Sequence, residues 1–247
     1  MHDRTIIKIG GKDNQEFLQN LVTNNICDTK GDLIYAALLS PQGKFQFDFF
    51  IFKNNQNYML DVATDKAEAL NSRLSIYKLR ADVKIETSDL KVSLGIDKKP
   101  DQAFLDPRDK GLGWRLYSKK KIHNAIDWDN LRINLVIPET DKELLQDSYI
   151  LEMGFERLRG VDFKKGCYVG QEVTARMKHK TKLRKGLARI RVSKEVDLHT
   201  PVFDGNKKIG FVGTQSGDKA LAYIRYESLN EKLTAADAIV SDIEIFD

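Results

Sequence analysis

The spacing of hydrophobic residues changes near residue 180, and this change limits the possible folds more than any other feature of the sequence. Before it, stretches with helical spacing are interleaved with short apolar runs. After it, helical spacing disappears and glycines separate short apolar runs. The 247 residues suffice for one large domain, or for one domain plus a small one. We therefore predict an α+β region over residues 1–181 and a small β-barrel domain over residues 182–247.

The first region contains signals for both helices and strands. Asp13 and Glu16 have the spacing of a capping box and apolar residues follow at helical spacing, which predicts an amphipathic helix over residues 13–24. Thr64 is the predicted N-cap of a second helix. The turn residues 41–43 lie between two apolar runs and predict a hairpin. Because strands and helices do not alternate regularly, we expect an antiparallel sheet. The predicted strands are residues 33–39, 45–52, 58–62, 83–85, 92–96 and 114–117, and in the barrel 187–192, 202–203, 209–212 and 221–224.

Composition excludes several classes of protein. With 31% charged residues, 41% hydrophobic residues, 16 Gly and 5 Pro, the chain is not disordered, collagen-like or a coiled coil. Cys27 and Cys167 are far apart and the four His are scattered, so neither a disulfide framework nor a metal site is predicted. No uncharged apolar run approaches the roughly 18 residues of a membrane-spanning helix, and the N-terminus lacks signal-peptide and transit-peptide features. We expect a cytoplasmic protein without a membrane partner, or a mitochondrial matrix protein if a targeting segment has been trimmed.

One segment around Cys167 carries the strongest signal for function. Gly166 and Gly170 allow the backbone near Cys167 to bend sharply and to approach another group closely. Lys164 and Lys165 place positive charge beside the sulfur, which favours the reactive thiolate. The alternative is that Cys167 is a small buried hydrophobic residue in a tight turn.

The motif Lys-Gly-Cys-Tyr-x-Gly-Gln-Glu resembles the signature of the YgfZ-type folate-binding proteins. This family includes mitochondrial iron-sulfur assembly factors and is related to the aminomethyltransferase of glycine cleavage. The chain is similar to the family in order and over essentially its whole length. The motif residues are Lys165, Gly166, Cys167, Tyr168, Gly170, Gln171 and Glu172, and the other matching segments are 11–24, 39–44, 106–108, 112–115, 132–139, 216–217 and 220–222.

The resemblance implies a fold and a function. It implies an aminomethyltransferase-like α+β folate-binding region arranged around a central opening and closed by the C-terminal β-barrel. The implied cofactor is tetrahydrofolate or a one-carbon derivative. The implied function is that of an auxiliary protein for iron-sulfur cluster assembly or repair and for iron-sulfur-dependent tRNA modification, with iron-sulfur assembly proteins or client enzymes as partners. Cys167 would be the functional thiol.

A pterin presents a ring N–H beside an amino group, so one carboxylate can accept two parallel hydrogen bonds from it. Glu152 stands where the superfamily carries a pterin-binding glutamate within Glu-Ala-Gly, with Met153 in place of Ala; the alternative is a solvated glutamate at a helix end. Arg176 or Arg108 could bind the glutamate tail of a folate, although Arg108 could instead brace the turn at residues 106–107.

The other motif residues have two interpretations each. Tyr168 offers a ring for stacking on a ligand, or it is a core aromatic. Gln171 and Glu172 contribute to the site, or they fasten the turn to a neighbouring domain. The role of Cys167 stays open between a cluster contact, a mixed disulfide and a partner contact.

An active aminomethyltransferase is the second hypothesis. Such enzymes carry paired aspartates after a glycine-rich hairpin, whereas this chain has Phe47 and Asp48 at the matching positions. Replacing a carboxylate by a phenyl ring removes its charge and any proton transfer. We therefore expect an accessory protein rather than an active transferase.

A non-catalytic tRNA-binding module is the third hypothesis. The net charge is +4, yet residues 173–194 contain no acid, and from Arg176 to Arg184 cations occupy every second position. An extended segment would place these cations on one side, where they could hold phosphates or a folate polyglutamate tail; otherwise the segment is an exposed linker. No aromatic residue lies between Tyr168 and Phe203, so a base-stacking platform is missing. The cations are Arg176, Lys178, Lys180, Lys182, Arg184, Lys185, Arg189, Arg191 and Lys194.

Overall fold

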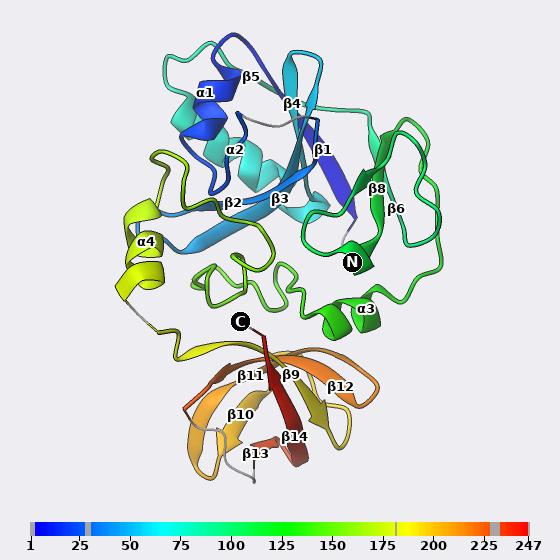
Figure 1. Cartoon of the computed structure of the whole chain (residues 1–247), viewed down its shortest axis with the longest axis vertical. Helices are drawn as coiled ribbons and strands as arrows, with labels where there is room; N and C mark the ends of the chain where they lie inside the picture. The colour runs from blue at the N-terminus through cyan, green and yellow to red at the C-terminus, as the bar shows by residue number, and fades with distance from the viewer. Residues whose placement is uncertain (1–2, 28–30, 181, 228–232, 247) are drawn as a thin grey trace. The chain divides into compact units, whose positions relative to one another are not determined.

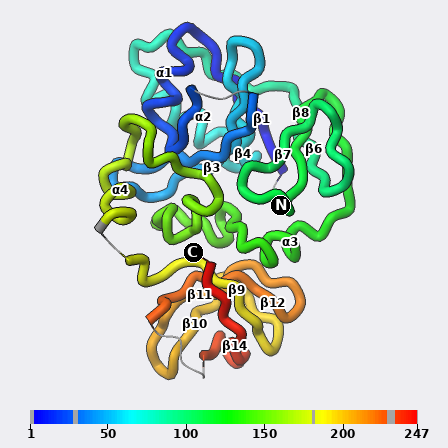
Figure 2. The backbone as a smooth tube through the Cα atoms, in the orientation of Figure 1, coloured from blue at the N-terminus to red at the C-terminus, as the bar shows by residue number. Residues whose placement is uncertain are grey.

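The computed structural model describes residues 3–27, 31–180, 182–227 and 233–246 (Figures 1 and 2). The chain divides into two compact units. The N-terminal unit comprises residues 2–126 and 158–172, and the C-terminal unit comprises residues 127–157 and 173–247. The domain boundary predicted between residues 181 and 182 stays a prediction, and residue 181 lies outside the described residues.

The N-terminal unit is built on a five-stranded antiparallel sheet in the order β2-β3-β4-β1-β5. Residues 34–39 and 45–54 pair as the predicted hairpin, with Ala37 opposite Asp48. A second sheet has the order β6-β8-β7. The strands are β1 (Arg4–Gly10), β2 (Ile34–Leu39), β3 (Phe45–Asn54), β4 (Asn57–Ala63), β5 (Lys84–Thr87), β6 (Lys91–Gly95), β7 (Phe104–Leu105) and β8 (Trp114–Ser118).

Two helices complete the core of this unit. Helix α1 is Asn14–Gln19, and helix α2 is Ala67–Lys78, preceded by a 3-10 turn at Thr64–Lys66; a second 3-10 turn is Lys110–Leu112. Leu18 of α1 and Leu70 and Leu74 of α2 pack against apolar side chains of the five-stranded sheet.

The first helix is shorter than the predicted range 13–24, and hydrogen bonds explain why. Thr23 pairs with Ala37 of β2 and Val22 bridges to Leu38, so this stretch joins the sheet edge instead of continuing the helix. The Asp13 side chain does not cap α1, because its carboxylate accepts the backbone N–H of Asp82 at 2.7 Å.

The C-terminal unit contains a closed barrel of six strands in the order β10-β11-β12-β9-β14-β13, which confirms the predicted barrel (Figure 1). Its core is made of small and branched apolar residues such as Ala222 and Val240. Helix α3 (Trp128–Leu135) contacts β11 and β12. The barrel strands are β9 (Lys185–Val192), β10 (Pro201–Asp204), β11 (Lys207–Ser216), β12 (Lys219–Arg225), β13 (Leu233–Ala235) and β14 (Ala238–Ile245).

The cations at 176, 178 and 180 do not form the extended one-sided row that their alternation suggested. They lie in helix α4 (Gln171–Lys180). Because successive helical residues are rotated by about 100°, positions two apart point to nearly opposite sides. Among them, Lys178 pairs with Glu156 at 2.5 Å.

A buried ion network connects the two sheets of the N-terminal unit. Asp61 of β4 accepts the guanidinium groups of Arg4 and Arg115 at 2.6 and 2.9 Å and the Tyr117 hydroxyl at 2.9 Å. Arg115 of β8 also reaches Asp106 at 3.1 Å and lies 3.7 Å from the centre of the Phe50 ring. Paired, hydrogen-bonded charges can be buried in this way, whereas a single unpaired charge there would be very costly.

Acid should weaken this network through Asp106. Burial raises the pKa of the Asp106 carboxyl, but the charges of Arg108 and Arg115 and the hydrogen bonds outweigh that effect and bring the pKa to about 2. The unfolded carboxyl binds its proton near pH 4, so the stabilisation is complete above that pH and lost as the pH falls to 2. We expect a loss of about 2 kcal/mol in the free energy of unfolding, measured by urea unfolding between pH 5 and pH 2.

The matched variant is Asp106→Asn, because the amide side chain of asparagine does not bind a proton in this pH range. It should be less stable at pH 5 and should show a shallower dependence on pH below 4. An unchanged slope in this variant would exclude Asp106 as the titrating group.

Candidate functional site

Cys167 is a free, exposed thiol on a loop of the N-terminal unit. The interpretation of Cys167 as a buried hydrophobic residue is therefore wrong, and the sulfur is open to solvent. Val169, two residues further on, packs against the apolar core of the five-stranded sheet. On this loop Cys167 is therefore exposed, whereas Val169 is fixed against the core.

Lys165, which precedes Cys167, anchors the same loop. The side chain is buried, and its ammonium donates to the carbonyl oxygens of Gln19, Val22 and Asn24 at 2.7, 2.5 and 3.1 Å. These carbonyls lie at the end of α1 and in the segment after it, where no helical N–H is available to them. Burial lowers the pKa of Lys165 to about 8. The expectation that Lys165 directs its charge at Cys167 needs correction, because the ammonium is directed at the three carbonyls.

Further hydrogen bonds join the loop to the segment after α1. The Thr23 hydroxyl donates to the carbonyl of Gly160 at 2.6 Å, and the backbone N–H of Asp162 donates to the carbonyl of Thr23 at 3.0 Å. Asp162 then accepts the backbone N–H of Lys164 at 2.7 Å. The loop before the thiol is therefore held by main-chain and side-chain bonds together.

The two glycines of the motif have different structural roles. Gly170 has φ +82°, and a Cβ there would lie 2.6 Å from the carbonyl oxygen of Ser40 in the β2–β3 turn. Only glycine fits this close approach without strain. A Cβ at Gly166 would meet no atom within 4 Å. Space next to Cys167 is therefore open on the Gly166 side.

Glu152 belongs to the C-terminal unit and is 8% exposed, so it is not a solvated glutamate. Its Oε2 accepts the hydroxyl of Tyr223 at 2.6 Å and lies 3.8 Å from the ammonium of Lys185. Burial, together with the Glu152 carboxylate, raises the pKa of Tyr223. Oε1 has no hydrogen bond within the part of the chain that the structure describes.

Glu152 is one of the residues that line a cavity of about 420 Å³. Its walls combine apolar residues, among them Leu151, Leu187 and Met177, with the charged residues Glu156, Arg157 and Lys178. A cavity of this size with apolar walls and some polar groups is typical of small-molecule sites.

The remaining predicted ligand residues lie in different places. Arg108 is buried, and its guanidinium binds both carboxylate oxygens of Asp106 at 3.0 and 2.8 Å, as expected for the alternative in which it braces the turn. Arg176 is exposed on α4. Tyr168 is 8% exposed, with the Lys165 ammonium 5.2 Å from its ring centre. The roles of these side chains in binding a folate stay predictions.

Gln171 and Glu172 are the first residues of α4. Both belong to the N-terminal unit, like Cys167, Tyr168 and Arg108, whereas Glu152 and Arg176 belong to the C-terminal unit.

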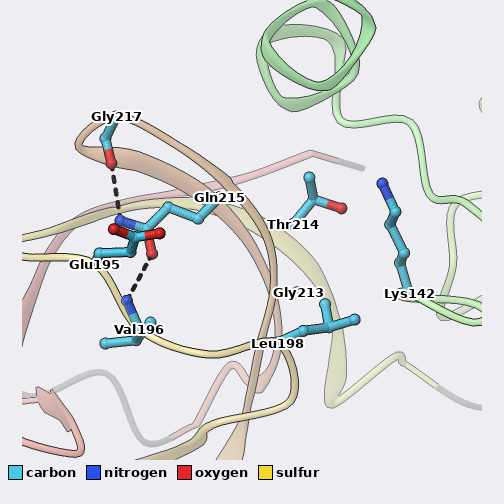
Figure 3. Close-up of a pocket in the computed structure, with 8 residues that line it drawn as sticks. All are labelled: Lys142, Glu195, Val196, Leu198, Gly213, Thr214, Gln215 and Gly217. Carbon is cyan, nitrogen blue, oxygen red and sulfur yellow. Dashed lines mark hydrogen bonds between the residues drawn. The ribbon is translucent and has the colours of Figure 1, made fainter.

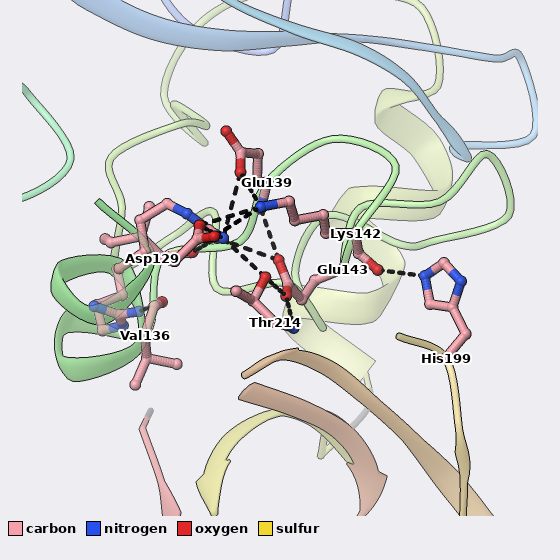
Figure 4. Close-up of polar contacts among 10 residues, drawn as sticks. Asp129, Val136, Glu139, Lys142, Glu143, His199 and Thr214 are labelled. Atoms are coloured by element: carbon pink, nitrogen blue, oxygen red, sulfur yellow. Dashed lines mark hydrogen bonds and ion pairs between the residues drawn. The ribbon is translucent and has the colours of Figure 1, made fainter. Parts of the chain in front are cut away.

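A polar cluster in the C-terminal unit escaped the sequence analysis (Figure 4). Arg132 of α3 is 1% exposed and pairs with Asp129, Glu139 and Glu143 at 2.9, 3.3 and 3.4 Å. It also donates to the Thr214 hydroxyl of β11 at 2.8 Å, so the cluster fastens residues 129–143 to the barrel. Isolated charged residues on a short helix gave no sequence signal for this arrangement.

A second cavity of about 420 Å³ lies beside this cluster (Figure 3). Lys142 and Glu195 line opposite sides of it, but Lys142 already pairs with Asp129 and Glu139, each at 3.1 Å. The cavity therefore offers few free polar groups. Among the described residues, no group of His, Cys, Asp or Glu could hold a metal ion, and no helix is long and apolar enough to cross a membrane.

Removing the Lys165 ammonium should loosen the loop that carries the thiol. Lys165→Met keeps the aliphatic length but leaves three carbonyls without their donor, so we expect a loss of about 3 kcal/mol in the free energy of unfolding, measured in urea. Lys164→Met, at an exposed position, should change stability by less than about 0.5 kcal/mol. Equal stability of the two variants would contradict the anchoring role.

The sequence of this chain is similar to those of several known proteins. Residues 184–243 match the family model described as CAF17, C-terminal beta-barrel domain. The chain is 29% identical to the mitochondrial iron-sulfur cluster assembly factor IBA57 homolog of Pyricularia oryzae, over 75% of this chain and 54% of that protein. It is 25% identical to human mitochondrial IBA57, over 76% of this chain and 64% of that protein. The chain spans about half the length of the first of these curated relatives.

A solved structure shows the fold. The glycine cleavage system aminomethyltransferase T of Bartonella henselae superposes with a TM-score of 0.73 over 99% of this chain and 83% of that chain, at 13% identity. The predicted fold class, an aminomethyltransferase-like α+β fold with a C-terminal barrel, is thereby confirmed. The chain is therefore similar in sequence to IBA57-type proteins, in its barrel to the CAF17 C-terminal domain, and in fold to an aminomethyltransferase; the YgfZ label stays an expectation.

Proposed function

We propose that this chain is a tetrahydrofolate-binding auxiliary protein of iron-sulfur cluster assembly or repair, with Cys167 as its functional thiol. The observation that carries the proposal is an exposed sulfur on a loop fixed by the three hydrogen bonds of Lys165. The curated relatives are named iron-sulfur cluster assembly factors, which supports the same function. They are also named mitochondrial, which favours the mitochondrion over the cytoplasm as the site of action.

The chemistry of a single thiolate limits what Cys167 does with a cluster. A thiolate can ligate iron or exchange with a disulfide, and a cluster usually takes four ligands. The chain has two cysteines, so a cluster handled as cargo would take its other ligands from a partner. Exposure of the sulfur and the open space beside Gly166 allow such a partner to approach. The proposed partners are iron-sulfur assembly proteins and iron-sulfur client enzymes, including those that modify tRNA.

The cavity at Glu152 fits the pterin end of a reduced folate. A buried carboxylate with one uncommitted oxygen can accept the adjacent ring N–H and amino group of a pterin, and the apolar walls suit the ring faces. The Tyr223 hydroxyl holds Oε2 in place and so fixes the orientation of the carboxylate. When bound, tetrahydrofolate would supply a carrier for one-carbon units, and the protein residues would bind and orient it. Arg176 is the exposed cation proposed for the glutamate tail.

No observation favours the two other hypotheses. Phe47, in the place of a transferase aspartate, packs against the apolar core, and Asp48 accepts the buried hydroxyl of Tyr35 at 2.9 Å. Asp48 is thus already engaged by a tyrosine rather than available to a substrate amine. The helical arrangement of Arg176 and Lys178 removes the continuous cationic row on which tRNA binding depended.

The thiol is tested by Cys167→Ser in a deletion strain that lacks the protein. Because serine keeps the size but not the thiolate, we expect a normal melting temperature and loss of iron-sulfur enzyme activity and of iron-sulfur-dependent tRNA modification. Cys27→Ser is the matched control, since Cys27 is also exposed, and it should restore both activities. Full restoration by Cys167→Ser would exclude a functional thiol.

The folate site is tested by calorimetric titration with tetrahydrofolate. Glu152→Gln replaces an accepting oxygen by an amide donor and should weaken binding by about 10- to 100-fold. Glu156→Gln changes an exposed carboxylate at the same cavity and should leave the affinity unchanged. Absence of binding by the unaltered protein to any reduced folate would remove the ligand from the proposal while leaving the thiol untouched.

A further inference from the structure

Helix α2 ends in an exposed apolar projection, formed by Ile76 and Leu79. Ile76 exposes 64% of its surface and Leu79, directly after the last residue of the helix, exposes 89%. Both residues stand at the C-terminal end of α2, three positions apart in the chain. The opposite side of α2 carries Leu70 and Leu74 into the core, so the fold does not use the two exposed side chains for packing. We call Ile76 and Leu79 the α2 projection.

The backbone of Leu79 is strained. Its φ and ψ are 47° and −110°, a combination that side-chain-bearing residues rarely adopt and that glycine adopts freely. Such strain persists where the surroundings or a function require it. Packing cannot be the reason for leucine here, because nearly nine-tenths of the residue faces solvent. A strained position that presents a large apolar side chain to water points to an external apolar partner.

Cations outnumber acids in the sequence around the projection, although Asp82 lies three residues after Leu79. Between Glu68 and Asp82 the sequence contains no acidic residue and three cationic residues. These cations make no side-chain hydrogen bond or ion pair with any residue that the structure describes. They are Arg73, Lys78 and Arg80. This local excess of positive charge favours an anionic partner.

We propose that the α2 projection docks the N-terminal unit on the anionic surface of a lipid bilayer. Ile76 and Leu79 would enter the acyl region, and the three cations would lie at the level of the phosphates. A bilayer needs no preformed socket for a convex pair of aliphatic side chains, whereas anchors at protein interfaces are enriched in Trp, Tyr and Arg seated in pockets. Three unpartnered cations suit a diffuse negative surface, which attracts charge without fixed geometry.

The size of the projection makes this binding weak and reversible. The two side chains together hold fewer carbons than one myristoyl chain, which by itself gives only marginal binding, so the cations supply the required second signal. The inference goes beyond the proposed function and does not depend on it. It also departs from the expectation of no membrane partner, which rested on the absence of a spanning segment and does not bear on surface binding.

The test is flotation of the full chain with vesicles of phosphatidylcholine, with and without phosphatidylglycerol. We expect retention by the anionic vesicles only, weakening as salt is raised because salt screens exposed charges. Leu79→Gly should weaken retention by about tenfold or more without lowering the melting temperature, since glycine relieves the strain at this position. Arg80→Gln should weaken it by about fivefold.

The matched control is Ile239 on β14, which is 61% exposed, nearly as much as Ile76, but lies in a stretch, residues 233–246, that contains acids and no Lys or Arg. Ile76→Ser should weaken retention and Ile239→Ser should not. Equal retention by neutral vesicles, no retention at all, or retention unaffected by Leu79→Gly would each overturn the proposal. Loss of function by Leu79→Gly in cells without any vesicle binding would also overturn it and would assign the projection to an acidic protein partner.

Discussion

A buried ammonium must find oxygen acceptors, and the way Lys165 does so determines how the thiol loop is held. Its three carbonyl partners come from the end of α1 and the segment after it, more than 140 positions earlier in the chain. One side chain thus satisfies groups that a short helix leaves unpaired and joins the two parts of the N-terminal unit. Cys167, two residues after Lys165, remains exposed. The contacts that hold the loop are made by Lys165 and Val169 and not by the Cys167 side chain.

Buried charge networks play a similar part in both units. Asp61 and Arg115 connect the two sheets of the N-terminal unit, and Arg132 connects α3 to the barrel strand β11 in the C-terminal unit. In each network every buried ion lies beside an opposite charge, so burial does not leave an unpaired ion. Such networks add geometric definition to an apolar core, because each ion must meet its partner at a set distance.

The proposed function rests on two different kinds of surface. The thiol is open and supported by rigid contacts, as suits a group that meets a partner protein. Glu152 lines a cavity that has apolar and charged walls, and Tyr223 orients its carboxylate, which supports the proposal of a small planar ligand. Phe47 packs against the core and Asp48 is bonded to Tyr35, which supports the proposal of an auxiliary factor over that of a transferase.

Local pattern determined much of the fold. The hairpin at residues 41–43 and the change to short strands near residue 180 depend on neighbours in sequence, and both were predicted correctly. β1 was missed because Lys8 interrupts its apolar run, and β7 and β13 are too short for a periodic signal. The length of α1 and the helical form of residues 171–180 depended on distant partners.

The sequence by itself determined the fold class and singled out the Cys167 segment as a candidate site, since a motif of contiguous residues needs no tertiary information. Only the tertiary structure decided that Lys165 binds carbonyls, that Arg108 binds Asp106 and that Glu152 is buried beside Tyr223. It also placed a strained Leu79 in solvent. These features depend on whether residues far apart in the chain make contact. Neither periodicity nor composition specifies which distant groups meet.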